Sequence, residues 1–312
     1  TRLFYGSASR QNQKKQEPLS WETFDYSDSP KWDSRFDDKS TDIVRGRDLD
    51  VEEEAKEDRK LAEKMDRELN AFEKLSPQLV EDATKILQPY VQPKRLKRLD
   101  SVLNKRTRHT RFLFENPSNP SNVWACLRTL DSFGIQHVDL VVESGKYSGK
   151  AAIVQKRGMR TAMGSAQWLT LRNYPSTKHA VQDLKREGYQ IYASDLNPNA
   201  KDIREIQWHN DNDDDNDQPI CIVMGNENNG ISEEMRELAD HTFTLPMVGF
   251  AESFNLSVAT AITLAHLSAC SKDGKGPLRP GDLEKHKVKC LRLKGILNSL
   301  AQKRVGNALL KQ

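Results

Sequence analysis

Three segments of the chain combine asparagine with charged side chains, and two of them also with glycine, at spacings that a reaction centre could use. They are residues 122–131 (NVWACLRTLD), 222–232 (IVMGNENNGIS) and 245–259 (LPMVGFAESFNLSVA). Each follows, or contains the end of, an apolar run of the kind that forms a buried strand. Because ligand sites in parallel α/β sheets lie at the carboxyl ends of strands, these segments are the candidates for a binding or catalytic site.

In the first segment, Arg128 has the strongest chemical implication. It stands among Trp124, Leu127 and Leu130, which predicts a helix that is buried on several sides. A buried arginine needs an anionic partner, so this position indicates a phosphate or carboxylate ligand. Asn122 could assist such a site, or it could simply cap the helix.

The second segment is a turn bounded by two glycines, Gly225 and Gly230. Glycine permits a positive φ and a close approach of backbone to a ligand. The pattern is neither a Walker loop nor a dinucleotide-binding G-x-G-x-x-G, so nucleotide phosphates are not implied. Glu227, taken alone, fits an ordinary turn as well as a site.

The third segment leads from a strand end through an irregular loop into an apolar helix. Ser253 and Asn255 precede that helix, and each could be either a cap or a site residue. Small residues at 259–261 predict close packing of the helix, and we expect its partner to be another subunit.

Strands and helices alternate through the part of the chain that contains these segments. Strands are predicted at residues 111–115, 138–143, 189–194, 220–224 and 242–246, and helices at 122–133, 176–187, 232–239 and 255–268. This alternation predicts an α/β fold with a parallel sheet. The acidic run at 211–217 (DNDDDND) is predicted to be a surface loop within it.

Taken together and in this order, the three patterns resemble a known set of motifs. The elements N-x-x-A-x-x-R, G-x-E-x-x-G-I-S and L-P-M-x-G-x-x-x-S-x-N-x-S-V-A resemble the three motifs of the SpoU (TrmH) family of SPOUT methyltransferases. Members of that family are RNA ribose 2′-O-methyltransferases that use S-adenosylmethionine. The resemblance extends over about residues 94–270 and is nearest to the tRNA guanosine-18 2′-O-methyltransferases.

The resemblance implies a fold that the alternation alone does not predict. Alternating elements favour an unknotted, doubly wound sheet, and knotted chains are rare. The family instead has a C-terminal trefoil knot, here expected from about residue 221 to 270, and a homodimer with the site at the subunit interface. We follow the resemblance and expect a SPOUT-type parallel sheet with this knot.

The resemblance also implies roles for individual residues. The catalytic set comprises Arg128, Asn122, Glu227, Asn255 and Ser253. The S-adenosylmethionine site comprises Met224, Gly225, Leu245, Met247, Leu256 and Ser253, and no metal is implied. A guanidinium is a poor general base, so Arg128 acts either as an unusual base or as a clamp for the RNA phosphate. The family often has histidine at position 121, where this chain has serine, which leaves the role of that position open.

Basic residues are concentrated before and after the α/β region. The cluster predicted to bind RNA comprises Lys94, Arg95, Lys97, Arg98, Lys105, Arg106, Arg108 and Arg111. Apolar residues at 96, 99, 102 and 103 give this stretch one apolar face, so the cations should project from a docked helix towards phosphates. A second basic helix is expected at 283–310, where it could contact nucleic acid or a partner subunit.

The remaining sequence gives the domain organisation. The chain has 312 residues, with 48 Lys and Arg against 45 Asp and Glu. We expect a disordered or charged-helix extension at 1–75, a basic helical segment at 76–110, the methyltransferase domain at 111–272 and a basic helix at 273–312. No apolar run reaches the ~18–20 residues of a membrane span. The four cysteines are widely spaced, which favours small buried side chains over a disulfide or zinc framework.

The N-terminal extension carries two further expectations. Residues 1–16 are basic and rich in serine and glutamine, which fits an organellar transit segment, for a chloroplast or mitochondrion, as well as an ordinary disordered tail. Residues 48–75 mix many acidic and basic side chains with few apolar ones. That pattern favours a solvated helix, with docking on an additional protein as the alternative.

Three functions remain open at this point. A tRNA guanosine 2′-O-methyltransferase is the first, and an rRNA 2′-O-methyltransferase shares all of its motifs. The third is a non-catalytic RNA-binding or assembly subunit that keeps the fold. The presence of Asn122, Arg128, Glu227 and Asn255 argues against the third, because a scaffold has no need of them.

Overall fold

A computed structural model describes residues 75–118, 120–142, 165–208, 218–272 and 275–300. All of them belong to one compact unit of the chain, Glu53–Gln312. The predictions for residues 1–74, the acidic run at 211–217 and the end of the C-terminal basic segment lie outside the described residues. So does most of the segment between the second and third strands, from 143 to 164.

The centre of this unit is a sheet of seven strands in the order β3-β2-β1-β6-β4-β7-β5, and every neighbouring pair is parallel. The strands are β1 (Thr110–Glu115), β2 (His137–Val141), β3 (Thr170–Tyr174), β4 (Gln190–Ser194), β5 (Lys201–Asp202), β6 (Ile220–Met224) and β7 (His241–Thr244). The α/β class and the parallel sheet are therefore confirmed. The strand β6 has the predicted bounds, and β1, β2, β4 and β7 differ from theirs by a few residues at their ends.

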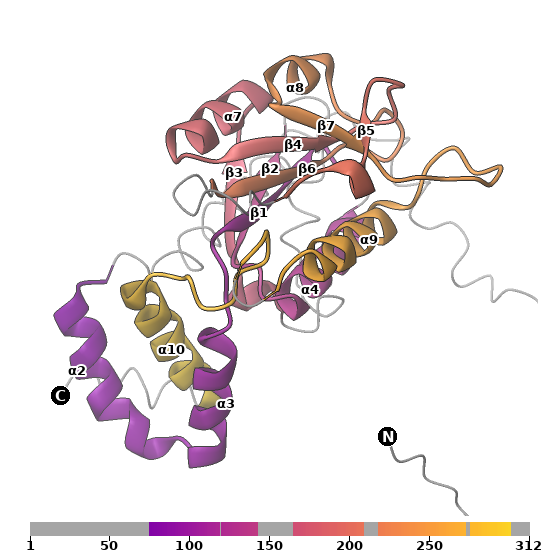
Figure 1. Ribbon diagram of the computed structural model, residues 1–312. Coiled ribbons are helices and arrows are strands. Elements are labelled where there is room, and N and C mark those ends of the chain that lie inside the picture. Colours follow the sequence, from indigo (N-terminus) through magenta and orange to yellow (C-terminus); the bar gives the residue numbers. More distant parts are fainter. Residues whose placement is uncertain (1–74, 119, 143–164, 209–217, 273–274, 301–312) are drawn as a thin grey trace, which may run out of the picture. The chain divides into compact units, whose positions relative to one another are not determined.

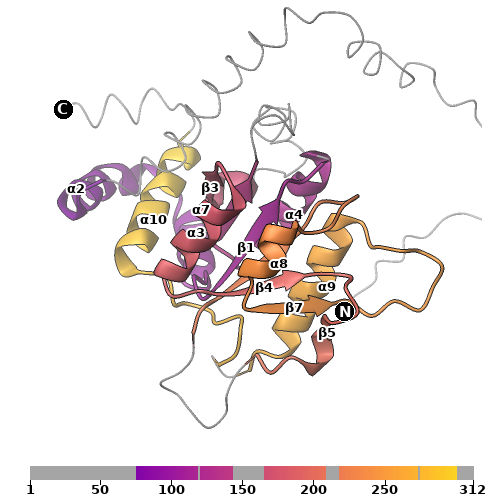
Figure 2. The same cartoon turned by 90° about the horizontal axis from the view of Figure 1, so that it is seen from above.

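Helices cover both faces of the sheet (Figure 1). One face carries α7 (Thr177–Arg186) and α8 (Glu233–Leu238), and the other carries α4 (Pro120–Ser132) and α9 (Leu256–Ala269). Alternate residues of β1 point to the two sides, so Leu113 joins the core under α7 and Phe112 and Phe114 join the core under α4 and α9. The α4 and α9 helices lie side by side, as Figure 2 shows from above.

Two short strands of the sheet, β3 and β5, were not predicted from the sequence. The strand β3 contains Arg172 and Asn173, which break its apolar pattern, and β5 has only two residues. Short 3-10 helices at Gln88–Tyr90, Ser165–Trp168 and Ile203–Glu205 complete the set. None of the helices in the described part of the chain combines the length and the apolar character that a membrane span requires.

The basic segments before and after the sheet share a small core of their own. The α2 (Pro77–Leu87) and α3 (Pro93–Leu103) helices both contact α10 (Lys285–Ser299), as Figure 1 shows. Their buried side chains are Val80, Ala83, Leu87, Val91, Leu99, Cys290, Leu293 and Ile296. Ser76 caps α2 by accepting a hydrogen bond from the Leu79 amide, as its sequence predicts.

The basic helix α10 packs within its own chain. Its apolar side contacts α2 and α3, and its contact with nucleic acid or a partner subunit stays a prediction. Two of its cations are also committed within the chain, because Arg292 pairs with Asp100 at 2.7 Å and Lys294 is buried. The helix therefore holds the basic N-terminal pair of helices in place.

Candidate active site

The carboxyl ends of β4, β6 and β7 open onto one cavity of about 440 Å³. A volume of this size is typical of small-molecule sites. The loops after these strands supply its walls. All six residues predicted to contact the cofactor line it: Met224, Gly225, Leu245, Met247, Ser253 and Leu256. Glu227 lines the same cavity, so the second and third sequence segments meet there.

The turn after β6 is built so that only glycine fits at its two ends. Asn226 and Gly230 exchange backbone hydrogen bonds of 2.8 and 2.9 Å, which closes the turn. Gly230 has a φ of +68°, a conformation that favours glycine. A Cβ on Gly225 would lie 2.3 Å from the carbonyl carbon of Gly230. The closed turn lines the cavity along its length, from Gly225 to Gly230.

A chain of hydrogen bonds joins the three sequence segments at the rim of this cavity. The Asn255 Nδ2 atom donates to Asn122 Oδ1 at 3.0 Å, and Asn122 Nδ2 donates to Glu227 Oε1 at 2.9 Å. Asn255 also caps α9, because its Oδ1 accepts from the backbone amide of Ser257 at 2.9 Å. The first turn of α4, the turn after β6 and the start of α9 are thereby linked through side chains.

The direction of this chain follows from the state of Glu227. Burial opposes ionisation of the carboxyl group, but hydrogen bonds from Ser118 and Asn122 outweigh burial and lower the pKa of Glu227 below its ordinary value. Both Ser118 bonds, from its backbone amide and its hydroxyl, measure 2.7 Å. An ionised carboxylate only accepts, so Asn122 must present its NH2 group to Glu227 and its oxygen to Asn255.

Arg128 does not occupy the position that the sequence predicted. It lies on the exposed side of α4, while Val123, Leu127 and Leu130 form the buried side. Within the described residues its guanidinium makes no hydrogen bond or ion pair. The expectation of a buried arginine is therefore wrong, because residue 128 faces away from the stripe of apolar residues that surrounds it in sequence. An exposed cation in the second half of α4, with no partner among the described residues, is available to a ligand that approaches from outside.

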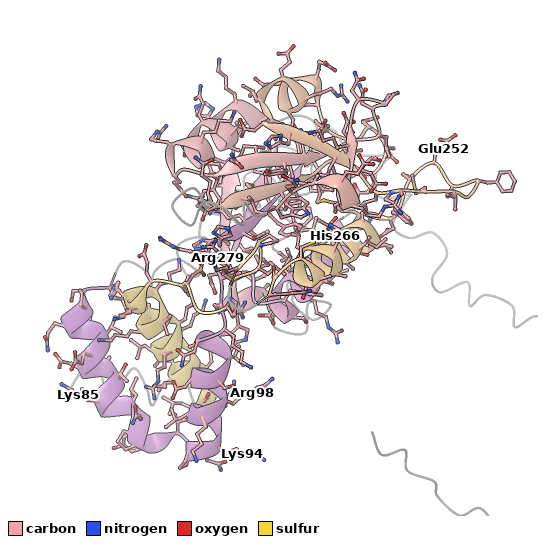
Figure 3. All side chains as sticks on the ribbon, in the orientation of Figure 1. Lys85, Lys94, Arg98, Glu252, His266 and Arg279 are labelled. Carbon is pink, nitrogen blue, oxygen red and sulfur yellow. The ribbon has the colours of Figure 1, made fainter. Side chains whose placement is uncertain are left out.

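The loop between β7 and α9 reaches away from the sheet (Figure 3). Figure 3 labels Glu252 on this loop, which lines the cavity together with Ser253 and Phe254. Ser253 itself is exposed. Val248 and Phe250, further out on the loop, are fully exposed to solvent. One wall of the cavity is thus a loop with apolar side chains turned outward.

The predicted RNA-binding cations fall into two groups. Six of them are exposed: Lys94, Arg95, Lys97, Arg98, Lys105 and Arg108. Figure 3 shows Lys94 and Arg98 extending from α3, which agrees with the predicted apolar inner face at Leu99 and Leu103. Arg106 and Arg111 are each only 2% exposed, so their assignment to an RNA-binding surface is wrong.

The two buried arginines bind acidic partners within the protein. Arg106 forms an ion pair with Asp131 and donates to the Ile135 carbonyl at 2.9 Å. Arg111 pairs with Asp139 at 3.0 Å and with Glu187 at 2.6 Å.

Arg172 completes this arrangement by pairing with the same two acids, Asp139 at 2.9 Å and Glu187 at 2.6 Å. Two guanidinium groups and two carboxylates therefore form a closed ring across β1, β2, β3 and the end of α7. Burial raises the pKa of Asp139, and the two arginines counteract this effect. The ring is a structural unit at the opposite end of the strands from the cavity.

Two other expectations concern the small residues of α9 and the four cysteines. Of the small residues of α9 that were expected to contact another subunit, two pack within the chain: Ala259 packs against the core and Thr260 Oγ1 lies 3.5 Å from Cys126 Sγ on α4. Cys270 is exposed, whereas Cys126, Cys221 and Cys290 are buried as predicted. Burial raises the pKa of the Cys126 thiol to about 12, which removes it as a nucleophile.

In the described part of the chain, no group of three or more His, Cys, Asp or Glu side chains is placed to hold a metal ion.

Residues 115–118, which connect β1 to α4, contribute to the site without having been singled out from the sequence. Ser118 holds Glu227, and the carbonyl of Asn116 accepts from Asn226 Nδ2 at 2.6 Å. Asn116 has a φ of +44°, which is unusual outside glycine. The one sequence signal was a polar Glu-Asn-Pro-Ser run directly after the apolar residues Phe112, Leu113 and Phe114.

Comparison with known proteins agrees with this geometry. The model of the SpoU rRNA methylase family matches residues 109–265, half of the chain and all of the cavity-lining segments. The chain belongs to the SpoU rRNA methylase family. The resemblance read from the three sequence motifs is therefore confirmed.

Individual members of the SpoU family align over much of their own length. A Borreliella burgdorferi protein named tRNA (guanosine(18)-2′-O)-methyltransferase is 30% identical over 182 residues, which cover 58% of this chain and 76% of that protein. A Thermus thermophilus protein of the same name is 34% identical, with 54% of this chain and 79% of that protein covered. A solved structure, described as the A. aeolicus TrmH/SpoU tRNA modifying enzyme, matches with a TM-score of 0.55 and 28% identity, and covers 67% of this chain and 98% of that one.

Proposed function

We propose that this SpoU-family chain transfers a methyl group from S-adenosylmethionine to the ribose 2′-oxygen of a guanosine in the D-loop of tRNA. The observation that carries the proposal is the Asn255–Asn122–Glu227 hydrogen-bond chain at the rim of the cavity. It brings the three family motifs to one place, with the uncommitted guanidinium of Arg128 on the helix that bears Asn122. The names of the B. burgdorferi and T. thermophilus relatives support tRNA guanosine as the substrate.

The cavity suits S-adenosylmethionine in size and in the kind of groups that line it. Backbone atoms at Gly225 and around Leu245 and Met247 would hold the adenosine and methionine parts, and the side chains of Met224 and Leu256 supply apolar surface. The absence of a Cβ at Gly225 lets its backbone approach that of Gly230, which closes the turn that lines this cavity. When bound, the cofactor supplies a methyl group on a positively charged sulfur.

The protein's part in the reaction is to place the ribose oxygen and to accommodate its proton. In-line placement of two reacting groups lowers a barrier by several kcal/mol. The exposed guanidinium of Arg128 fits a clamp on the RNA phosphate. Asn122 and Asn255 hold together the segments at the rim of the cavity. The anionic Glu227 fixes the orientation of both amides and does not itself accept the proton.

The clamp and the general-base role of Arg128 predict different pH dependence. A base of lowered pKa would give the rate a titration step that disappears in Arg128→Ala. A clamp would give no such step, and Arg128→Ala would lose affinity for tRNA at every pH. We expect the second result, measured from single-turnover rates between pH 6 and 9 with tRNA affinity determined in parallel.

We also propose that the protein works as a homodimer, with α9 at the interface. Val258 and Ile262 are one turn apart on α9 and are 45% and 37% exposed. Phe254 at the start of this helix is also exposed, so an apolar strip extends from the cavity loop onto α9. Ile262→Asp should convert the dimer to a monomer in light scattering, whereas Ser268→Asp, also exposed on α9, should not. A monomeric wild-type protein would contradict this proposal.

The exposed cations of α3 and of its connection to β1 form the proposed tRNA-binding surface: Lys94, Arg95, Lys97, Arg98, Lys105 and Arg108. Loss of one phosphate contact weakens binding and lowers the salt dependence by about one unit of slope. The double substitution Lys94→Ala and Arg98→Ala should therefore weaken tRNA binding without changing affinity for the methyl donor. Lys178→Ala, an exposed cation on α7, is the matched control.

The decisive experiment supplies radiolabelled S-adenosylmethionine together with tRNA or rRNA and maps the modified nucleotide. Label at a D-loop guanosine of tRNA supports the proposal. Label in rRNA alone would replace it with the rRNA methyltransferase alternative. No label in either RNA, together with no binding of the methyl donor, would favour a non-catalytic subunit.

Three further proposals concern parts for which the sequence or the family provides the only argument. The segment from about 221 to 270 is proposed to form a trefoil knot, which an experimental structure would test through the path of the chain. Residues 1–16 are proposed to direct the protein to a chloroplast or mitochondrion, which import of a fluorescent fusion would test. Residues 48–75 are proposed as a contact for an additional protein, which a pull-down with and without this segment would test.

A further inference from the structure

Glu115 is a buried carboxylate that the proposed reaction does not use. It ends β1, is 1% exposed, and has no cationic partner within the described residues. Three donors converge on it instead. Thr177 Oγ1 donates to Oε1 at 2.5 Å, Ser232 Oγ donates to Oε1 at 2.6 Å, and the Ser232 backbone amide donates to Oε2 at 2.8 Å. Such a set of donors matches a group that only accepts hydrogen bonds.

These contacts join three elements at the level of the cavity. Thr177 begins α7, and Ser232 caps α8 by accepting from the Met235 amide at 3.0 Å. In the sheet, Phe114 is paired with Met224, so Glu115 lies beside the point where β6 enters the glycine-bounded turn. Ser232 follows the end of that turn by two residues.

The end of β1 holds the same turn at two other points. The Asn116 carbonyl accepts from Asn226 near the start of the turn, and Ser118 donates to Glu227 in its middle. Glu115 holds the far side through Ser232. Glu115 does not itself line the cavity, whereas Gly225, Asn226 and Gly230 do. Its influence on a ligand must therefore act through the position of the turn.

We propose that Glu115 is a positioning residue for the methyl donor, which fixes Ser232 and thereby the cavity-lining turn. This inference rests on the proposed function, because it takes the cavity as the binding site of S-adenosylmethionine. Since the carboxylate acts on the turn and not on the reacting atoms, its loss should raise the KM for the methyl donor and leave kcat nearly unchanged.

The test compares Glu115→Gln with the wild-type enzyme on tRNA at saturating RNA. Glutamine keeps the size of the side chain but presents an NH2 group to one of three donors, so at least one buried donor loses its acceptor. We expect the KM for S-adenosylmethionine, and its Kd measured by calorimetry, to rise about tenfold. Ser232→Ala should raise the KM in the same way, and the double variant should be no worse than the more affected single variant.

Thr110→Val is the matched control. Thr110 lies at the other end of β1, is fully buried, and donates a hydrogen bond to the Pro277 carbonyl. Its loss should lower the melting temperature without changing the KM for the methyl donor. Thr177→Val, which removes one donor and retains Glu115, is a milder variant for the case that Glu115→Gln does not fold. It should also raise the KM for the methyl donor, but by less than Glu115→Gln is expected to raise it.

The outcomes separate this inference from the proposed function. A wild-type enzyme that methylates no RNA and binds no methyl donor contradicts the proposed function, and the Glu115 inference fails with it. An active wild-type enzyme with an unchanged KM in Glu115→Gln and Thr177→Val refutes the positioning role alone. An equal rise in KM in Thr110→Val, or fully additive effects in the double variant, would also refute it.

Discussion

Replacing Asn122 by aspartate tests whether the reaction depends on the hydrogen-bond chain across the three motifs. The two side chains have nearly the same shape, and aspartate can still accept a hydrogen bond from Asn255. It cannot donate to Glu227, which Asn122 does at 2.9 Å. Two carboxylates would therefore face each other where a donor now meets an acceptor.

The size of the effect follows from these two changes. A hydrogen bond to a charged group contributes about 1.5–3 kcal/mol. Repulsion between two charges ~4 Å apart adds about 1 kcal/mol when both are well solvated and more when they are not. Glu227 is partly exposed, so we use the lower values for both. Their sum of about 2.5 kcal/mol corresponds to a fall in kcat/KM of about 70-fold near pH 8.

The pH dependence makes this prediction specific. Repulsion raises the pKa of the paired carboxyl groups, so the pair takes up one proton at a pH where Glu227 alone stays ionised. The shared proton restores a donor between the two side chains. The activity of Asn122→Asp relative to the wild type should therefore rise as the pH falls from 8 to 5, measured by methyl incorporation into tRNA.

Two controls accompany this experiment. Asn122→Ala lacks both the donor and the new charge, so its activity relative to the wild type should not rise at low pH. Asn173→Asp adds the same charge at an exposed position on β3 and should have little effect. A kcat/KM for Asn122→Asp within twofold of the wild type at pH 8, or a ratio that stays flat with pH, would refute the reasoning.

Three other predictions follow from the same structure. Arg111→Met leaves the buried Asp139 with only one of its two arginines and should lower the free energy of unfolding by about 3 kcal/mol in urea; reduced tRNA affinity with unchanged stability would instead restore the RNA-binding assignment. Hydrogen bonds lower the pKa of Glu227, so its contribution to stability is complete above the ordinary glutamate pKa and is lost as the pH falls through the lowered value; the difference in melting temperature between wild type and Glu227→Gln should shrink accordingly on acidification. Arg128→Ala should weaken tRNA binding while the melting temperature changes by less than about 2 °C, because an exposed side chain with no partner among the described residues contributes little to stability; a large loss of stability would show that the arginine is structural.

The sequence predicted much of the cavity lining and the side chains joined at its rim, but not the contribution of residues 115–118 or the surroundings of the charged residues. Asn122, Glu227 and Asn255 were recognised because each stands in a short motif with fixed spacing, and the sheet brings those motifs together. The buried β6 was predicted with its bounds because five consecutive apolar residues lie between Pro219 and Gly225. Local pattern was enough in both cases.

Long-range pairing explains what the sequence could not provide. Arg111 stands in a basic run, yet its acidic partners lie 28 and 76 residues further along the chain. No local pattern distinguishes such an arginine from Lys97 or Arg98, which face solvent. Arg128 gave the opposite error, because apolar neighbours in sequence were taken to surround it in space. Both errors arise because the exposure of a side chain was inferred from its neighbours in sequence.

The Asn255–Asn122–Glu227 chain constrains how this protein can be re-engineered. The orientation of each amide in the chain is set by its neighbour in the chain. A segment from another protein that carries a different donor or acceptor at its contact would therefore reverse or break the hydrogen bonds. Exchange of the segment around Asn122 with that of a distant homologue should therefore succeed only when the segments around residues 227 and 255 are transplanted with it. Chimeras that take all three contacting segments from the same parent should keep their activity. Chimeras that take these segments from different parents should lose it.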